Sequence, residues 1–338
     1  MSEDVVRVSG APGSPYTRKM LAVLRYRRIP HHTVTRGSPE DAATPEPRVP
    51  IIPVLVFPGE TEARVDSTPL IAALDEAWPQ RRVAPRDPAT AFLDALIEDF
   101  GDEWLTKAMF HYRWYYRADI DRAAAVLPRW RGTMLPEETL AEMGRQFADR
   151  QIGRLWVVGS NNVTAPIIEA SYERTLRILD RCLTGRRFIL GARPGAGDFG
   201  VYGQLTQLCL FDPTPSAVAE RLAPRIVAWT QLVDDLSGVE VDDDGFDAPE
   251  TLPGAVRELF GEIGRVYAPF LLANAAALES GAEKVECEID GAEWVQQPFP
   301  YQGKCLALLR QQFARLDQGD RERVMGVLDG TGCEVLFG

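Results

Sequence analysis

The sequence predicts an α/β domain, then an all-helical domain, then an additional C-terminal segment, and three observations carry this fold class. About the first 80 residues alternate between strand and helix signals, whereas beyond Pro88 the apolar residues recur at helical spacing. Residues 234–250 contain eight acidic residues and no basic one, which is typical of a solvated linker or surface loop. We therefore divide the chain into residues 1–85, 86–235 and 236–338.

The first domain is expected to have the order βαβ followed by ββα. Short β-branched and apolar runs predict four strands, at residues 5–8, 32–35, 51–56 and 63–65. Apolar residues at helical spacing predict a helix over residues 17–28. A second helix is expected to open at residues 66–69, with Ser67 as its N-cap and Pro69 in its first turn.

The rest of the chain is predicted mainly from helical spacing. In the second part, helices are expected around residues 92–104, over residues 172–183 and after Asp198. In the third part, residues 256–263 predict a helix and residues 309–316 belong to a final one. Alternating residues 285–289 before Asp290-Gly291 predict a hairpin.

The charge of the chain argues against nucleic acid or an anionic membrane as its main partner. The 338 residues include 37 Lys+Arg and 49 Asp+Glu, a net charge of −12. The first 90 residues hold 12 basic and 11 acidic residues, so this part of the chain is nearly neutral. It can therefore accept an anionic ligand.

Cysteine usage and the opening residues indicate a reducing compartment. The five cysteines are widely spaced and form no C-x-x-C pair, so neither a disulfide framework nor a cysteine metal site is expected. The opening MSEDVV has no basic stretch leading into an apolar one, and no apolar run is long enough to span a membrane. We expect a cytoplasmic protein that binds no metal.

Ser14 is the first candidate site residue. It precedes Pro15 where the first helix is expected to begin, and the backbone N–H groups of a helix N-terminus favour a negative charge. A hydroxyl there can also donate to a thiolate, whose parent thiol has an ordinary pKa of about 8.5. The alternative is that Ser14 is only an N-cap.

Two further features of this domain can hold a ligand. A proline inside an apolar strand, as in Ile52-Pro53, interrupts it; a cis bond there would turn the backbone of Ile52 toward a peptide-like ligand. Pro50 is a second candidate for the cis bond. The other alternative is that Pro53 is an ordinary proline of an edge strand. Asp66 and Ser67, at a helix N-terminus, can bind the ammonium and carboxylate of an amino-acid head, or can form a simple helix cap.

Taken in order, these motifs make the chain similar to the glutathione transferase superfamily. The matching stretches are Ser14-Pro15-Tyr16-Thr17-Arg18-Lys19, Ile52-Pro53-Val54-Leu55, Val65-Asp66-Ser67-Thr68, and Phe188-Ile189-Leu190-Gly191 through Gly197-Asp198-Phe199. They cover roughly residues 5–235. The resemblance implies a thioredoxin-like N-terminal domain, a helical C-terminal domain and a homodimer. Gly195 stands where the family usually has the Ser or Thr of a capping box.

For the site, the resemblance implies glutathione as co-substrate. Ser14 matches the residue that stabilises the glutathione thiolate, and Pro53 matches the cis-proline beside Ile52. Asp66 and Ser67 match the residues that hold the γ-glutamyl group, while Tyr16 packs at the site or lines it. No cysteine precedes Cys182, so chemistry of the cysteine type is not expected.

The second substrate is expected to be a small apolar electrophile. Residues 110–116 (FHYRWYY) are rich in aromatic side chains, and only part of this run can face one side of a helix. We expect Tyr112 or Tyr115 to line the second-substrate pocket and Arg113 to contact an anion.

The sequence thus favours a glutathione transferase. A non-catalytic binding or scaffold protein of the same fold is the first alternative, and a glutathione-dependent ether-cleaving or dehalogenating enzyme is the second. Residues 250–338 match no module; they can cover the cleft, extend the helical domain or form a dimer contact.

Overall fold

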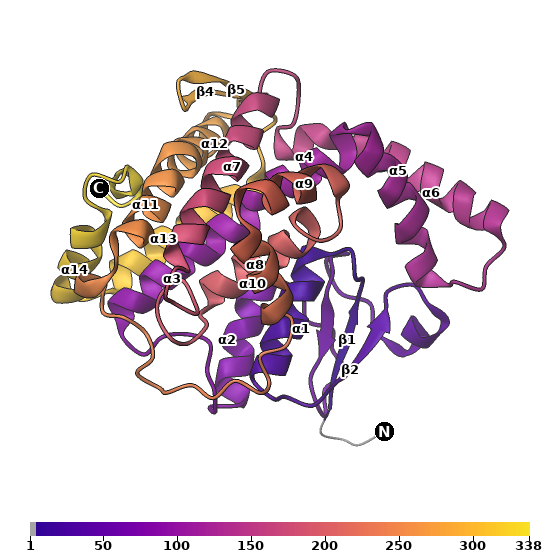
Figure 1. The fold of residues 1–338 in the computed structure, drawn as a ribbon, viewed down its shortest axis with the longest axis horizontal. Coiled ribbons are helices and arrows are strands. Elements are labelled where there is room, and N and C mark those ends of the chain that lie inside the picture. The colour runs from indigo at the N-terminus through magenta and orange to yellow at the C-terminus, as the bar shows by residue number, and fades with distance from the viewer. Residues whose placement is uncertain (1–4) are drawn as a thin grey trace.

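A computed structural model describes residues 5–338 and contains a small sheet at the N-terminal end, surrounded by helices (Figure 1). The sheet has the order β2-β1-β3, with β1 parallel to β2 and antiparallel to β3. Its strands are β1 (Val6–Gly10), β2 (His31–Thr35) and β3 (Val54–Val56). The stretch expected as a fourth strand contributes one bridge, between Leu55 and Arg64.

The interrupted strand is shorter than the sequence predicts. The Ile52–Pro53 peptide bond is cis, and β3 begins only after it, at Val54. Proline has no N–H to give to a ladder, which explains why residues 51–53 are left out of the sheet. A short 3₁₀ helix, Pro39–Ala43, precedes this stretch.

Two helices pack on the sheet, α1 (Pro15–Tyr26) and α2 (Ser67–Ala77). The expectation that Ser67 caps α2 is wrong, because Asp66 is the N-cap and Ser67 is the first helical residue. Asp66 has a φ of 78° and its side chain makes no capping hydrogen bond. The hydroxyl of Ser67 contacts Lys19 instead, at 3.1 Å.

The following part of the chain is helical, as predicted. Its helices are α3 (Pro88–Glu103), α4 (Leu105–Tyr115), α5 (Arg117–Val126), α6 (Glu137–Ile152), α7 (Ala165–Cys182), α8 (Ala196–Leu208), α9 (Pro213–Leu222) and α10 (Pro224–Val233). Helix α8 is buried along its whole length and packs between α1 and α3. Gly101 and Gly200 let α3 and α8 approach closely, since a Cβ on Gly101 would lie 2.7 Å from the Val201 nitrogen. The packing of α8 against α1 joins the sheet domain to the helical part.

The N-terminus of α8 is capped from another helix. Asp198 accepts hydrogen bonds from the backbone N–H groups of Gly195 and Ile189, at 3.0 and 2.9 Å. The N–H groups of Ala196 and Gly197 donate to the carboxylate of Asp94 on α3. Asp94 therefore supplies the oxygens that a Ser or Thr at position 195 would provide, and its carboxylate fills the space of a side chain there.

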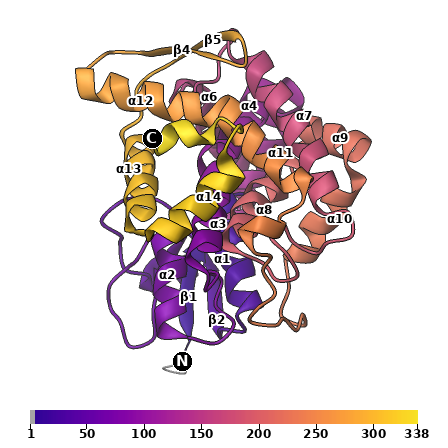
Figure 2. The same cartoon turned by 90° about the vertical axis from the view of Figure 1, so that its left-hand side faces the viewer.

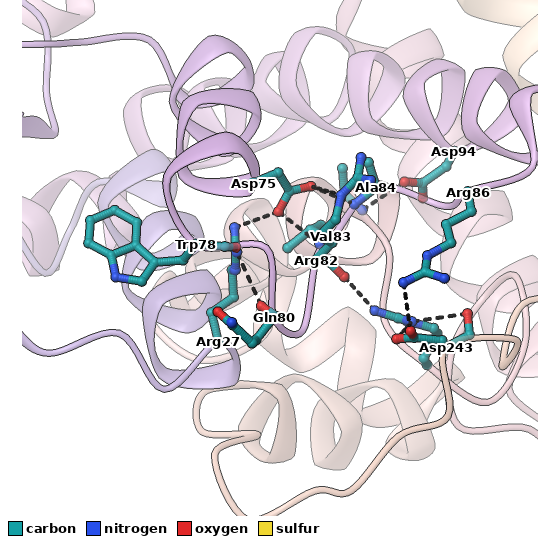
Figure 3. Close-up of polar contacts among 12 residues, drawn as sticks. Arg27, Asp75, Trp78, Gln80, Arg82, Val83, Ala84, Arg86, Asp94 and Asp243 are labelled. Atoms are coloured by element: carbon teal, nitrogen blue, oxygen red, sulfur yellow. Dashed lines mark hydrogen bonds and ion pairs between the residues drawn. The ribbon is translucent and has the colours of Figure 1, made fainter.

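The acidic stretch runs along the arginines of the first domain. Asp234 pairs with Arg18 and Arg25, at 2.7 and 3.0 Å. Figure 3 shows Arg86 paired with Asp243 at 2.7 Å. It also shows Arg27 donating to Asp75 at the end of α2. The acidic stretch is irregular, as expected of a surface loop, and its pairs with Arg18, Arg25 and Arg86 neutralise part of its charge.

The C-terminal part lies along α3 (Figure 2). It comprises a 3₁₀ turn (Pro249–Thr251), α11 (Gly254–Glu262), a π-helical turn (Ile263–Tyr267), α12 (Ala268–Ser280), β4 (Val285–Ile289), β5 (Ala292–Gln296), α13 (Pro300–Arg315), α14 (Gln318–Leu328) and a last 3₁₀ turn (Cys333–Leu336). The predicted hairpin is confirmed, with positive φ at Asp290 and Gly291. The expectation of a single final helix is wrong: α13 ends at Arg315 and α14 follows. Within residues 5–338, no helix has the length and apolar composition that membrane crossing requires.

Candidate active site

A pocket of about 710 Å³ opens between the sheet domain and the helices α4 and α6. One wall comes from the loop after β1, the residues after β2 and residues 50–52. The other wall comes from α4, the 3₁₀ turn Leu127–Arg131 and α6, which projects with α5 from the helical body (Figure 1). Ser14, Tyr16, Ile52 and Arg113 line this pocket, so the structure brings four of the expected site residues together.

Ser14 lies at the N-terminus of α1 and is 9% exposed. Its Oγ accepts a hydrogen bond from the backbone N–H of Thr17 at 3.3 Å, which is the geometry of an N-cap. Ser14 can therefore be both an N-cap and a donor to a thiolate. Its hydroxyl oxygen accepts the hydrogen bond from Thr17 through a lone pair, and its O–H stays available to donate into the pocket. The dipole of α1 adds a favourable field for a negative charge there.

Gly13 sets the floor of the pocket beside Ser14. A Cβ on Gly13 would lie 2.6 Å from both the Leu127 and the Trp130 side chains. The glycine thus allows the 3₁₀ turn Leu127–Arg131 to close over the loop that precedes α1. No pattern in the sequence indicates a role for this turn.

Arg113 is a buried ion-pair partner that reaches the pocket. Its Nε and Nη2 donate to the carboxylate of Asp212, at distances from 2.8 to 3.0 Å. Its Nη1 donates to the Gly13 carbonyl oxygen at 2.9 Å. The charge of Arg113 is thereby balanced by Asp212, and its guanidinium holds the loop that carries Ser14.

The cis peptide bond is at Ile52–Pro53, the first of the two predicted positions, and not at Pro50. Pro50, Ile51 and Ile52 line the pocket, whereas Pro53 is buried behind them. The backbone of Ile52 is therefore at the pocket wall, next to the region of Ser14.

Asp66 and Ser67 do not line this pocket and are engaged by other side chains. The hydroxyl of Tyr301, on α13, donates to Asp66 Oδ2 at 3.0 Å. Ser67 is 5% exposed, and its Oγ accepts a hydrogen bond from the Lys19 ammonium. The C-terminal segment thus covers one end of the expected glutathione site.

Lys19 belongs to a buried ionic network beneath Ser67. Its Nζ lies 2.6 Å from Glu98 Oε1 and 2.5 Å from Asp102 Oδ2, and its side chain is fully buried. Burial alone would lower the pKa of Lys19, but the carboxylates of Asp102 and Glu98 outweigh it and raise that pKa. Burial raises the pKa of Asp102 to about 6, against the opposing charge of Lys19. The network therefore holds a permanent ammonium under the N-terminus of α2.

The three candidate tyrosines lie in different places. Tyr16 lines the pocket, but its hydroxyl turns away and donates to the backbone oxygen of Asp102 at 2.9 Å. Tyr112 is buried, packs on Tyr172 and does not line the pocket. Tyr115 is 37% exposed and donates to Asn162 at 2.9 Å, also outside the pocket.

Most of the pocket wall on the helical side comes from residues that sequence analysis had not singled out. Phe110 was noted only as part of the aromatic run. The apolar lining side chains on this side are Met109, Phe110, Trp114, Leu127, Trp130, Met143 and Phe147. The basic lining side chains on this side, besides Arg113, are Arg131, Arg150 and Arg154, whereas Arg36 lies on the sheet side. The helical pattern in residues 137–152 could have predicted α6, but no local signal shows that it packs against α4 and α5 and lines this pocket.

Within residues 5–338, no group of three or more His, Cys, Asp or Glu side chains has the arrangement of a metal site. The five cysteines form no disulfide with one another, and burial raises the pKa of Cys182 and Cys209 to about 12. The polar groups that line the pocket include the Ser14 hydroxyl and the guanidinium groups of its arginines.

Comparison with known proteins gives a family for the first domain. Residues 8–82 match the family model described as the glutathione S-transferase N-terminal domain. No curated protein matches the sequence at a significant level.

Solved structures of glutathione transferases match the chain at low identity. One from Methylobacterium radiotolerans, in complex with glutathione sulfonate, is 16% identical; the match covers 70% of this chain and 98% of that one, with a TM-score of 0.38. One from Rhodospirillum rubrum is 16% identical, over 74% and 97% of the two chains, with a TM-score of 0.41. A family member from Pseudomonas fluorescens, with two glutathione molecules bound, is 15% identical over 70% and 94%, with a TM-score of 0.43.

The expected fold class is confirmed, since a small thioredoxin-like domain precedes a helical region and an additional C-terminal part. Residues 8–82 are identified by the family model as a glutathione S-transferase N-terminal domain, and the rest of the chain lies outside that match.

Proposed function

We propose that the protein binds glutathione in the pocket beside α1 and transfers it to a small electrophile. The observation that supports this most is the shared position of Ser14 and Ile52. The hydroxyl at a helix N-terminus and the backbone before the cis-proline line one pocket, next to an apolar wall. A thiol at Ser14 and an apolar second substrate would therefore meet in one enclosed space.

Ser14 would lower the pKa of the glutathione thiol. Its O–H donates to the thiolate and not to the thiol, and the N-terminus of α1 adds a positive field. Both effects favour the ionised form, which is the nucleophile that attacks an electrophilic carbon. Arg113 holds the Gly13 carbonyl and so fixes the loop on which Ser14 stands.

The γ-glutamyl end of glutathione would reach Asp66 and Ser67. Asp66 can accept from the ammonium group, and the first N–H groups of α2 can donate to the carboxylate. For this, the hydroxyl of Tyr301 has to share or leave Asp66 Oδ2. The C-terminal segment would then regulate access to this end of the site.

Calorimetric titration with glutathione tests the proposal, together with ultraviolet absorbance of the bound thiolate at neutral pH. Ser14→Ala removes the hydroxyl and the N-cap, whereas Ser14→Asp keeps a capping oxygen and places a negative charge against the thiolate. We expect both variants to lose thiolate absorbance. Thiolate formation that survives in Ser14→Asp would contradict the role of Ser14.

A non-catalytic binding protein is the second candidate, and the engagement of Asp66 and Ser67 favours it. Their side chains already bond Tyr301 and Lys19, so glutathione competes with the chain itself. Tyr301→Phe removes one competitor. If the wild type gives no heat with glutathione and Tyr301→Phe also gives none, the binding-protein function is favoured over the transferase.

The family match of residues 8–82 also supports a homodimer. Light scattering of the purified protein tests it, because a dimer of this 37.5 kDa chain has twice that mass.

A further inference from the structure

The first turn of α13 contacts both the expected γ-glutamyl site and a buried carboxyl group. The hydroxyl of Tyr301 donates to Asp66 Oδ2 at 3.0 Å. The side-chain amide of the next residue, Gln302, donates to Glu103 Oε2 and to the Glu103 backbone oxygen, both at 3.1 Å. Because Tyr301 and Gln302 are neighbours in one helical turn, a change at Glu103 can reach Asp66 through that turn.

Glu103 belongs to a row of acidic residues on α3 that has too few cations. The row consists of Asp99, Asp102 and Glu103, of which the last two are each 7% exposed. Lys19 pairs with Asp102 at 2.5 Å. In the part of the chain that the structure describes, neither Asp99 nor Glu103 has a cation within ion-pair distance. Burial, with the charges of Asp99 and Asp102, raises the pKa of Glu103 to about 8.

Lys107, on α4, is the cation that faces Glu103 from beyond ion-pair distance. Its ammonium donates to Gln296 Oε1 at 3.1 Å and lies 4.0 Å from the centre of the Phe270 ring. Burial lowers the pKa of Lys107 to about 7, against the charge of Glu103. Lys107 therefore loses its positive charge in the pH range in which Glu103 gains a negative one, and it cannot compensate that charge.

On the other elements packed around it, Glu103 faces three phenols and a thiol. They are Tyr16 of α1, Tyr267 of the π-helical turn, and Tyr301 and Cys305 of α13. Burial, with the charges of nearby carboxylates, raises the pKa of each of these groups well above its ordinary value. They stay neutral up to pH 8 and supply no positive charge.

The neutral form of Glu103 also matches the amide that it meets. Gln302 Oε1 is buried and accepts no hydrogen bond from a described residue. A carboxylic acid can donate to an amide oxygen and accept from the amide N–H group, whereas a carboxylate can only accept. Protonated Glu103 thus suits the position of α13 against α3, and ionised Glu103 is a buried charge without a paired cation.

We propose that α13 is a pH-sensitive gate on the γ-glutamyl end of the site, closed while Glu103 is protonated and opened when Glu103 ionises. In the closed form, Tyr301 occupies Asp66. Release of the Glu103 proton to solvent requires water to reach the carboxylate, so the first turn of α13 leaves α3 and Asp66 is free to accept from an ammonium group. This inference rests on the proposed function, because it names the regulation of the same site.

A rise in pH favours opening of the gate, because the closed form binds the Glu103 proton more tightly than the open form does. The pKa of Glu103 is about 8 in the closed form, against an ordinary value of 4.5 once water reaches it. Between these two values, the equilibrium constant for opening rises by up to about tenfold per pH unit.

Hydrogen–deuterium exchange of the full chain at pH 6, 7 and 8 tests the gate without a ligand. After correction for the intrinsic exchange rate, we expect protection of residues 301–306 in the wild type to fall about tenfold or more from pH 6 to pH 8. In Glu103→Gln it should change less than about twofold. Glu279→Gln, at an exposed glutamate of α12, is the matched control and should follow the wild type. Gln302→Ala removes the amide and should lower the protection already at pH 6.

Calorimetry with S-methylglutathione, which has no thiol to ionise, tests what the gate controls. We expect the wild type to bind it about tenfold more tightly at pH 8 than at pH 6, and Glu103→Gln to bind it equally at both. Tyr301→Phe removes the group that occupies Asp66 and should bind it more tightly than the wild type at pH 6.

Protection that does not change with pH in the wild type, or that changes equally in Glu103→Gln, overturns the gate. Wild-type protection at pH 6 in Gln302→Ala also overturns it. Exchange as expected, with equal wild-type affinities for S-methylglutathione at pH 6 and pH 8, overturns the control of the site by α13. Absence of binding in both the wild type and Tyr301→Phe at either pH rejects the proposed function, while the exchange result still supports or overturns the opening of α13.

Discussion

Glu103, at the end of α3, is held by the C-terminal segment in a setting that favours its neutral form. It is 7% exposed, and the Gln302 amide on α13 donates to its Oε2 and to its backbone oxygen, both at 3.1 Å. Burial, with the nearby charges of Asp99 and Asp102, raises its pKa from 4.5 to about 8. The substitution Glu103→Gln keeps the shape and an acceptor for Gln302 but removes the titration.

The direction in which pH changes the free energy of unfolding follows from how strongly the folded and the unfolded chain bind the proton of Glu103. Between pH 4.5 and about 8 the folded protein keeps the proton on Glu103 and the unfolded chain releases it, so the free energy of unfolding falls as pH rises. One group contributes about 1.4 kcal/mol per pH unit in this window. The pKa difference therefore corresponds to a loss of about 5 kcal/mol across the window, of which about 4 kcal/mol falls between pH 5 and 8. The variant Glu103→Gln has no carboxyl to ionise at this position and therefore avoids this loss of stability.

Urea unfolding at several pH values, followed by tryptophan fluorescence and circular dichroism, measures this difference. We expect Glu103→Gln to gain stability relative to the wild type steadily from about pH 5 to about pH 8. Glu138→Gln, at an exposed glutamate in the first turn of α6, should follow the wild-type curve within about 0.5 kcal/mol. Parallel curves for Glu103→Gln and the wild type, or a variant that is less stable at pH 8, would mean that Glu103 is already ionised in the folded protein at these pH values. The reasoning would then be refuted.

Three further substitutions test the local packing of the site and of its support. Gly195→Ser restores the residue type usual at an N-cap, yet we expect it to lower the unfolding free energy by about 1–3 kcal/mol in urea, because its side chain collides with Asp94. Arg113→Gln leaves Asp212 buried without its cation and should cost about 3–5 kcal/mol by the same assay, with Arg113→Met/Asp212→Leu recovering most of it. Gly13→Ala should move the wall of the pocket and weaken binding of anilinonaphthalene sulfonate about threefold or more, with little change in melting temperature.

Signals from residues close together in the sequence were sufficient to predict most of the helices and strands. The βαβ order, the cis-proline at Ile52–Pro53 and the hairpin at Asp290-Gly291 all depend on residues close in sequence, and the structure has each of them. The position of Ser14 at the start of α1 is of the same kind. Propensity, turn chemistry and proline geometry act over a few residues, so a sequence can report them.

Long-range packing accounts for what the sequence did not predict. Asp94 caps α8 from 102 residues away, and no pattern around Gly195 indicates it. Tyr112 was a candidate for the pocket, but the helix turns it toward Tyr172 in the core. Which face of an aromatic run meets a ligand depends on the helices that pack against it, and those contacts are set by tertiary structure.

The same long-range packing gives the molecule its separation of charge. The carboxylates of α3 meet α1 and α13, where Lys19 neutralises some of them and burial raises the pKa of others such as Glu103. The pocket beside Ser14 is lined by Arg131 of the 3₁₀ turn, Arg150 of α6 and Arg154 after it, none of which pairs with a carboxylate among the described residues. Because an unpaired buried carboxylate near Ser14 would raise the pKa of a bound thiol, keeping the acidic side chains behind the helices is a condition for stabilising a thiolate in an acidic protein. The C-terminal segment reaches the same region, since the hydroxyl of Tyr301 donates a hydrogen bond to Asp66.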